Sequence, residues 1–151
     1  MARLATIVRD ERGNSIIELA LVVPFLSSLL IGMVDISRGY SAKLQLQQAA
    51  QQAIEKVMQT SASSSVIATL TGEAATAAGV ATSAVAVDFW LECNGTRQSV
   101  YDSSCSAGQT YARYLTVDIT KAYAPMFRVK FLGSNNDGTF TLHGKAGIRT
   151  Q

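Results

Sequence analysis

Hydrophobic positions along this chain fall into two patterns, a long continuous run near the N-terminus and short alternating runs in the second half. From Ile16 to Val34 about 19 residues are mostly apolar, and at 1.5 Å per helical residue they reach roughly 28 Å, the thickness of a bilayer's hydrocarbon core. A secretory signal would have an apolar core of about 7 to 15 residues followed by a small-x-small cleavage site. Because this run is longer and charged residues follow it within 35–38, the pattern predicts a membrane span over 16–34.

The helix that contains the span is expected to continue beyond it. Residues 35–58 contain no strong helix breaker and are rich in Gln, Ala, Leu and Lys, which favour helix. Inside the span, Pro24 predicts a slight kink because proline cannot donate a backbone hydrogen bond. We therefore expect one helix over 14–58, whose outer half needs a packing partner for a mostly apolar face. That face comprises Ile36, Tyr40, Ala50, Ile54, Val57 and Met58, with Lys43 and Gln47 interrupting it.

A second, shorter helix is expected over 66–78, after a linker at 60–65 and with Gly79 as its C-cap. Apolar and polar residues then alternate with a period of two in three segments, which predicts three half-buried strands. The inward-facing residues would be Val85, Val87, Phe89 and Leu91, then Leu115, Val117 and Ile119, then Phe140, Leu142, Ala146 and Ile148.

The expected fold is α+β, because the apolar sheet face and the outer half of the long helix each need a partner. Packing one on the other gives a long N-terminal helix, a short second helix and a small three-stranded antiparallel sheet. Residues 1–13 would form a leader and residues 59–151 a head domain. The leader carries Arg3, Arg9 and Arg12, an excess over the nearest basic residues after the span, so the positive-inside rule predicts a cytoplasmic N-terminus and an exported head.

Catalytic and ligand-binding chemistry is not expected. Net charge is only +2 and no basic face interleaved with aromatics is evident, which argues against a nucleic-acid partner. His143, the single histidine, falls on a polar strand face, and no Gly-x-Ser-x-Gly elbow or phosphate-binding glycine loop occurs. Two thiols and one distant histidine do not form a metal-ligand set, so we expect no metal, cofactor or small-molecule substrate.

Two cysteines and three aromatic residues stand out in the predicted head. Cys93 and Cys105 enclose a short polar loop, and an oxidising periplasm would favour a disulfide over free thiols. Asn94 and Gly95 favour a turn beside the first of them. Trp90 on the polar strand face, with Tyr101 and Tyr111 flanking the cysteine loop, would be covered by a short helix or would contact another subunit.

Glu18 is a carboxylate inside the apolar run. Within a spanning helix a charge costs about 2.5 to 3.5 kcal/mol at the bilayer centre, so such a residue is a functional candidate. The alternative is structural, since Glu18 lies close enough to the start of the run to reach the headgroups. The residues do not decide between these two readings.

Gly13, followed by four residues and then Glu18 at the start of a long apolar helix, is the processing signature of type IV pilin-like proteins. The wider run RGNSIIELALVVPFLSSLLIGMVDISR, from Arg12 to Arg38, resembles the TadE-like minor pilins, or pseudopilins, of the tight-adherence (Tad/Flp) pilus. The resemblance implies a pilin-like plan and cleavage after Gly13 by a dedicated prepilin peptidase, leaving Asn14 as the first residue. Glu18 would then pair with the new N-terminus of a neighbouring subunit.

The resemblance also implies partners and location: other pilin subunits, the Tad/Flp assembly machinery and the bacterial inner membrane, then the pilus at the cell surface, for adhesion or colonisation. Asn14 departs from the large apolar first residue of type IV pilins proper, which leaves N-terminal methylation open. About 90 residues beyond the helix favour a low-copy subunit over a major one. The alternatives are an uncleaved single-pass anchor with a periplasmic binding module and, third, a secreted enzyme.

Overall fold

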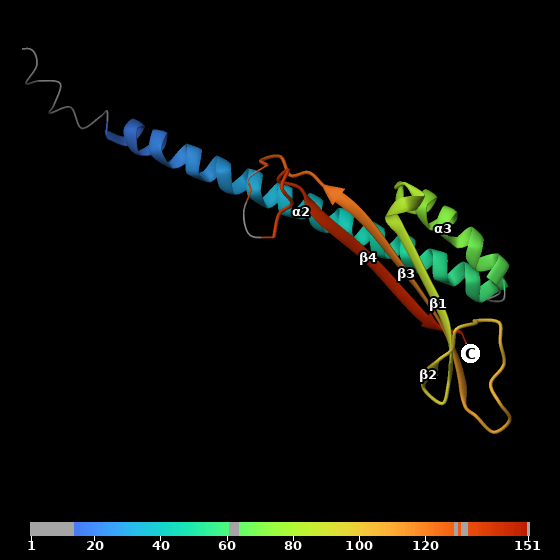
Figure 1. The fold of residues 1–151 in the computed structure, drawn as a ribbon. Coiled ribbons are helices and arrows are strands. Elements are labelled where there is room, and N and C mark those ends of the chain that lie inside the picture. Colours follow the sequence, from blue (N-terminus) through green and yellow to red (C-terminus); the bar gives the residue numbers. More distant parts are fainter. Residues whose placement is uncertain (1–13, 61–63, 129, 131–132, 151) are drawn as a thin grey trace, which may run out of the picture. The chain divides into compact units, whose positions relative to one another are not determined.

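The computed structural model describes residues 14–60, 64–128, 130 and 133–150 and has the expected α+β architecture (Figure 1). Contacts divide the chain into two units, which meet between Arg38 and Gly39. The helices and strands are α2 (Asn14–Thr60), α3 (Ser64–Ala78), the 3-10 turn η2 (Thr82–Ala84), β1 (Val85–Cys93), β2 (Thr96–Arg97), β3 (Tyr111–Tyr123) and β4 (Phe140–Arg149).

The first unit is the apolar part of α2. Among the described residues, α2 is the one helix long and apolar enough to cross a membrane. Pro24 lies inside it, and the two hydroxyls that follow are satisfied within the helix. Ser27 donates to the carbonyl of Val23 and Ser28 to that of Phe25, both at 2.8 Å. The hydroxyl groups are thus compatible with an apolar surround, where an unsatisfied polar group would be costly.

The second unit is built on the outer part of α2, which buries a regular stripe of side chains. Ala50, Ile54 and Val57 belong to this stripe as expected, whereas Tyr40 and Met58 are 64% and 61% exposed. The predicted face is therefore partly wrong, because the buried stripe is centred on small residues that a hydrophobicity plot weights weakly. Its members are spaced three or four apart, namely Leu46, Ala49, Ala50, Ala53, Ile54 and Val57.

Helix α3 contributes a similar set of small buried residues to the same core. Leu70, Ala74 and Ala75 are at most 3% exposed and cluster with the alanines of α2. The helix ends at Gly79 as expected, since that residue adopts φ 62° and its N–H donates to the Thr76 carbonyl. It begins at Ser64, so part of the predicted linker is helical.

The sheet is antiparallel throughout and has the strand order β2-β1-β3-β4. The expected meander is confirmed, but the sheet has four strands rather than three. The missed strand, β2, is two residues long and has no alternating pattern to detect. It forms because Asn94 and Gly95 adopt φ 49° and 78°, the two positive values of a type I′ turn that folds the chain back onto β1.

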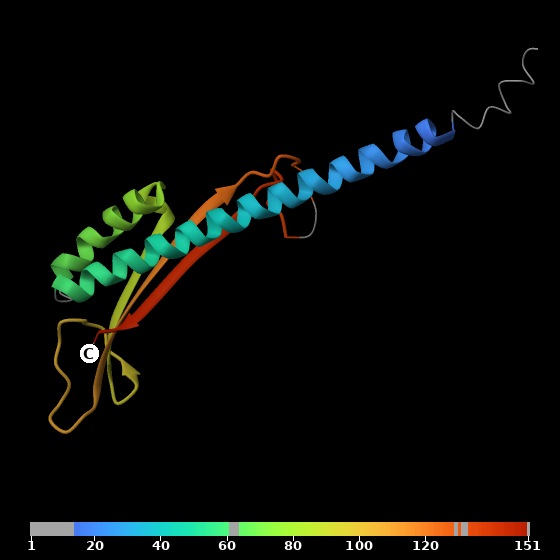
Figure 2. The same ribbon diagram turned by 180° about the vertical axis from the view of Figure 1, so that it is seen from behind.

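One face of the sheet packs on the helices, and Figures 1 and 2 show α3 and the outer part of α2 on the same side of the strands. Leu115, Val117 and Ile119 of the central strand β3 are fully buried there. Gly144 of β4 permits the closest approach, since a Cβ on this residue would lie 2.3 Å from the backbone carbon of Leu46. The helix and the sheet therefore meet backbone to backbone at this point.

The turn that leads into β4 is closed by short polar contacts. Asp137 accepts hydrogen bonds from the hydroxyl and the backbone N–H of Thr139, at 2.7 and 3.1 Å. These bonds lower the pKa of Asp137 below its usual value because they favour the charged carboxylate. The bond from the Thr139 hydroxyl has the largest effect. The Asn135 amide donates to the hydroxyls of Thr139 and Thr141, which fixes the start of the strand.

The contact at Gly144 generates a stability prediction. Gly144→Ala should lower the free energy of unfolding by about 1 to 3 kcal/mol, since a backbone cannot move aside as a flexible side chain can. Trp90, the only tryptophan in the sequence, lies in β1, so its fluorescence during denaturant unfolding reports on the head alone.

Gly72→Ala is the matched control, because nothing lies within 4 Å of an added Cβ there and alanine favours helix. This variant should be as stable as the wild type or more so. Equal unfolding midpoints for Gly144→Ala and the wild type would contradict the close helix–sheet contact.

Candidate functional site

The sequence-predicted processing segment lies at the start of α2. Gly13 falls outside the described residues, while Asn14 is the first residue of the helix. Glu18 lies one helical turn later, on the same helix face as Asn14 by its spacing. It is the only charged residue between 14 and 34, and its neighbours Ile17 and Leu19 are 61% and 62% exposed. A mature chain starting at Asn14 would therefore place its N-terminal amine and a carboxylate at one end of an apolar helix.

The two cysteines lie together at the far end of the sheet. Cys93 ends β1, and its sulfur is bonded to that of Cys105. The disulfide links the end of β1 to the connection between β2 and β3, and it is the pairing favoured from the sequence. The Asn94 side-chain oxygen accepts bonds from the N–H and hydroxyl of Thr110, at 2.9 and 3.0 Å. This end of the head is therefore fixed by one covalent bond and by local hydrogen bonds.

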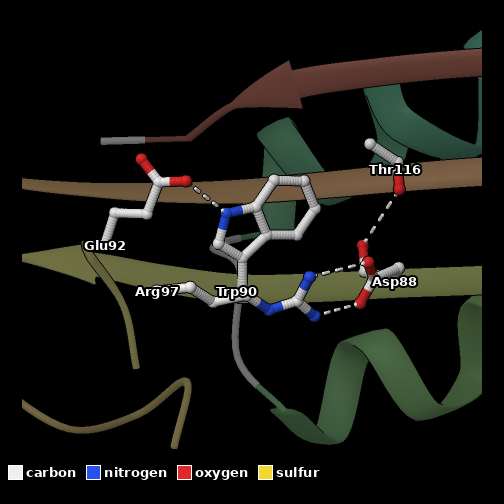
Figure 3. A network of polar contacts seen from close by, with 5 residues as sticks. All are labelled: Asp88, Trp90, Glu92, Arg97 and Thr116. Carbon is white, nitrogen blue, oxygen red and sulfur yellow. Dashed lines mark hydrogen bonds and ion pairs between the residues drawn. The ribbon is translucent and has the colours of Figure 1, made fainter. Parts of the chain in front are cut away.

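The sheet face opposite the helices carries an aromatic and charged cluster (Figure 3). Arg97 makes two bonds to the Asp88 carboxylate, at 2.7 and 3.3 Å, and its guanidinium lies 4.8 Å from the Trp90 ring centroid. The indole N–H donates to Glu92 at 2.8 Å, and the ring stacks on Tyr114 at 5.2 Å. Trp90 is thus held in one orientation on a surface of mixed charge.

Trp90 is not covered by a helix, contrary to one of the two expectations for it. The strand register places it beside Tyr114, and α3 packs on the opposite face, with Val85 and Val87. The residues that partly bury Trp90 are its own strand neighbours and Arg97. Arg97 was missed in the sequence because the strand that carries it was missed.

The expectation that Tyr101 would be covered by a short helix or would contact another subunit was wrong. Its side chain is only 6% exposed, with its ring edge-on to Phe89 at 5.3 Å and its hydroxyl without a hydrogen-bond partner among the described residues. Arg113 donates to the Tyr101 and Ser103 carbonyls, and these bonds hold the loop in place while Tyr101 joins the hydrophobic core. Tyr111, by contrast, is 52% exposed.

His143 lies on the exposed sheet face, where its ring nitrogen is 3.3 Å from an oxygen of Asp118. Within the described ranges, no group of three or more His, Cys, Asp and Glu side chains converges as a metal site would require. The pair therefore forms part of a polar surface.

The fold defines a class of protein, one with a single candidate membrane span and an α+β domain. Comparison with known proteins finds a similarity: residues 13–54 match the model of the family described as TadE-like protein. The TadE-like resemblance is thereby confirmed for this segment, which is less than half of the chain, and the match is consistent with a protein associated with the Tad pilus. The match begins at Gly13 and ends within the buried stripe of α2. No curated protein and no solved structure matches the chain.

The disulfide generates a second stability prediction. Replacing both cysteines, as Cys93→Ala with Cys105→Ala, should lower the free energy of unfolding by about 3 kcal/mol, since the open loop gains entropy when unfolded. Denaturant midpoints followed by Trp90 fluorescence measure the loss.

Reductant should destabilise the wild type by a similar amount and leave the double variant unchanged. A wild-type midpoint that does not respond to reductant would contradict a stabilising role for this bond.

Proposed function

We propose that this protein is a minor pilin, or pseudopilin, of a Tad/Flp pilus, matured by cleavage after Gly13 and assembled through α2. The observation that carries the proposal is the arrangement at the helix start. The family match begins at Gly13, the helix begins at Asn14, and Glu18 is the only charge in the apolar run. Cleavage at that boundary would release the helix with a free amine as its first group.

The physical chemistry of this N-terminus explains why a carboxylate is retained in an apolar helix. The new ammonium would lie at the positive end of the helix dipole, where a cation is disfavoured. It would also lie at the edge of the bilayer, where an unpaired charge is expensive. Glu18 is the nearest counter-charge in sequence, so it neutralises the amine.

Pairing between subunits would make Glu18 a determinant of register. If neighbouring helices pack side by side with an axial offset of about one turn, the carboxylate of one helix meets the amine of the next. Each subunit then supplies one acceptor and one donor, and only one offset satisfies both. A leucine at this position would leave the offset unspecified.

The remaining parts of the proposal concern place and partners. The leader faces the cytoplasm, where the prepilin peptidase acts, and the head faces the periplasm until assembly brings it to the pilus. Partners are other pilin subunits and the Tad/Flp assembly machinery, with adhesion or colonisation as the outcome. The role is structural, with no catalysis.

The second candidate function is an uncleaved single-pass anchor whose head binds another envelope component. The cluster of Trp90, Arg97 and Asp88 favours it, because an oriented aromatic ring flanked by charges on an open sheet face is suited to protein contact. The two candidate functions differ in whether the chain is cleaved after Gly13, so a test of cleavage distinguishes them.

Gly13→Val should block processing, since a peptidase that cleaves after glycine has no room for a branched side chain. In cells with an active prepilin peptidase, intact mass should show the wild type lacking residues 1–13 and the variant retaining them. Gly32→Val is the matched control, because this glycine lies inside the span and has nothing within 4 Å of an added Cβ.

A wild-type protein that keeps its first 13 residues in such cells would remove the pilin proposal and leave the anchor. Loss of residues 1–13 in Gly13→Val as well would place the cleavage determinant elsewhere.

Glu18→Gln should be processed normally but enter pili more than about tenfold less, because leaving a buried charge unpaired costs about 3 to 5 kcal/mol. Quantitative immunoblots of sheared pili against total membrane protein measure the ratio. The control is Glu55→Gln, an exposed carboxylate on the outer part of the same helix, which should enter pili as the wild type does. Normal incorporation of Glu18→Gln would show that the carboxylate does not set the register.

A further inference from the structure

The connection between β3 and β4 exposes large apolar side chains beside basic ones. Met126 and Phe127 are 58% and 63% exposed, and the exposed side chains of Arg128 and Lys130 follow them. Soluble surfaces rarely place adjacent large apolar residues in water, whereas aromatic and cationic side chains together are typical of segments that lie at a membrane interface.

The position of this connection in the head is determined by its first strand. Tyr123 ends β3, and its ring packs against Gly39, since a Cβ on that glycine would lie 3.4 Å from the ring. Gly39 comes five residues after Val34, the last residue of the apolar run. Five residues span at most about 18 Å, and about 7.5 Å at the rise of the helix they occupy. The end of β3 is therefore tethered close to the predicted membrane surface at any angle between the two units.

The charges near this end of the head suit an anionic surface. Arg38 and Lys43 flank Gly39 in sequence, and Arg128 and Lys130 come from the connection itself. Two carboxylates also lie near this end in sequence, Asp35 in α2 and Asp137, and Asp137 already accepts two hydrogen bonds from Thr139. Basic residues held near a bilayer are attracted to acidic phospholipid headgroups.

We propose that four described residues of the β3–β4 connection, Met126, Phe127, Arg128 and Lys130, form a membrane-contact element. Met126 and Phe127 enter the headgroup boundary of the leaflet on the head side, while Arg128 and Lys130 pair with phosphates of anionic phospholipids. The proposal rests on the membrane location in the proposed function. A second attachment beside the span would limit the swing of the head before the subunit is assembled.

The opposite end of the sheet provides an internal reference. Val100, which is 56% exposed, follows β2 near the disulfide, at the end where Cys93 pairs with Tyr111. Strand β3 runs from that end to Tyr123, and its 13 residues extend roughly 40 Å at the usual rise per residue. A reporter at Val100 should therefore remain in water while one at Phe127 meets lipid.

The experiment uses the full chain in nanodiscs that contain anionic phosphatidylglycerol, with or without bromine on the lipid acyl chains near the headgroup. Bromine quenches tryptophan fluorescence only at close approach. The wild type, whose only tryptophan is Trp90, therefore gives the baseline emission in each lipid. Phe127→Trp should lose additional emission in brominated lipid, whereas Val100→Trp should behave as the baseline does. Adding Arg128→Gln and Lys130→Gln to Phe127→Trp should reduce the quenching.

A third reporter separates failure of this proposal from failure of the membrane location. Phe25→Trp, inside the span, should be strongly quenched. Quenching of Phe25→Trp without quenching of Phe127→Trp would overturn the membrane-contact element alone, and no quenching of either would overturn the membrane location. A blue-shifted but unquenched Phe127→Trp would mean that a second copy covers the connection, which also overturns the lipid contact.

Discussion

The close approach of α2 to β4 is the constraint on which the head depends. Gly144 lets the Leu46 backbone lie almost against the strand, and the alanines of α2 share one core cluster with the small residues of α3. Small residues at these contacts let backbones approach closely, and close packing of this kind is typical of protein interiors. The buried leucines, isoleucines and valines then fill the space that remains.

The two parts of the long helix α2 differ in how their apolar residues are distributed. Its first part is apolar on all sides, as a lipid-facing helix must be, and its outer part is apolar on one stripe only. Glu18 is the exception in the first part, and it lies where a mature N-terminus would need a counter-charge. In the proposed function, its place close to Gly13 would link processing to the geometry of assembly.

The two faces of the sheet have separate roles. One face packs in the core. The other face carries Trp90, whose orientation is fixed by contacts with Arg97 and Glu92. A fixed side chain loses little entropy on contact, so such a face is suited to meeting a partner. Met126, Phe127, Arg128 and Lys130 add a third surface, which is apolar and basic, after the end of β3 where Tyr123 packs against Gly39.

The sequence by itself determined the candidate span, the two helices, three of the four strands and the inward residues of β3, because apolar spans and half-buried sheets impose strong patterns on the chain. It also carries the resemblance of residues 13–54 to the TadE-like family. Only the tertiary structure decided which stripe of α2 is buried, that Tyr101 lies inside, and that Arg97 covers Trp90. These depend on contacts between segments far apart in sequence, and small residues such as Gly144 and Ala50 make such contacts without leaving a hydrophobic pattern.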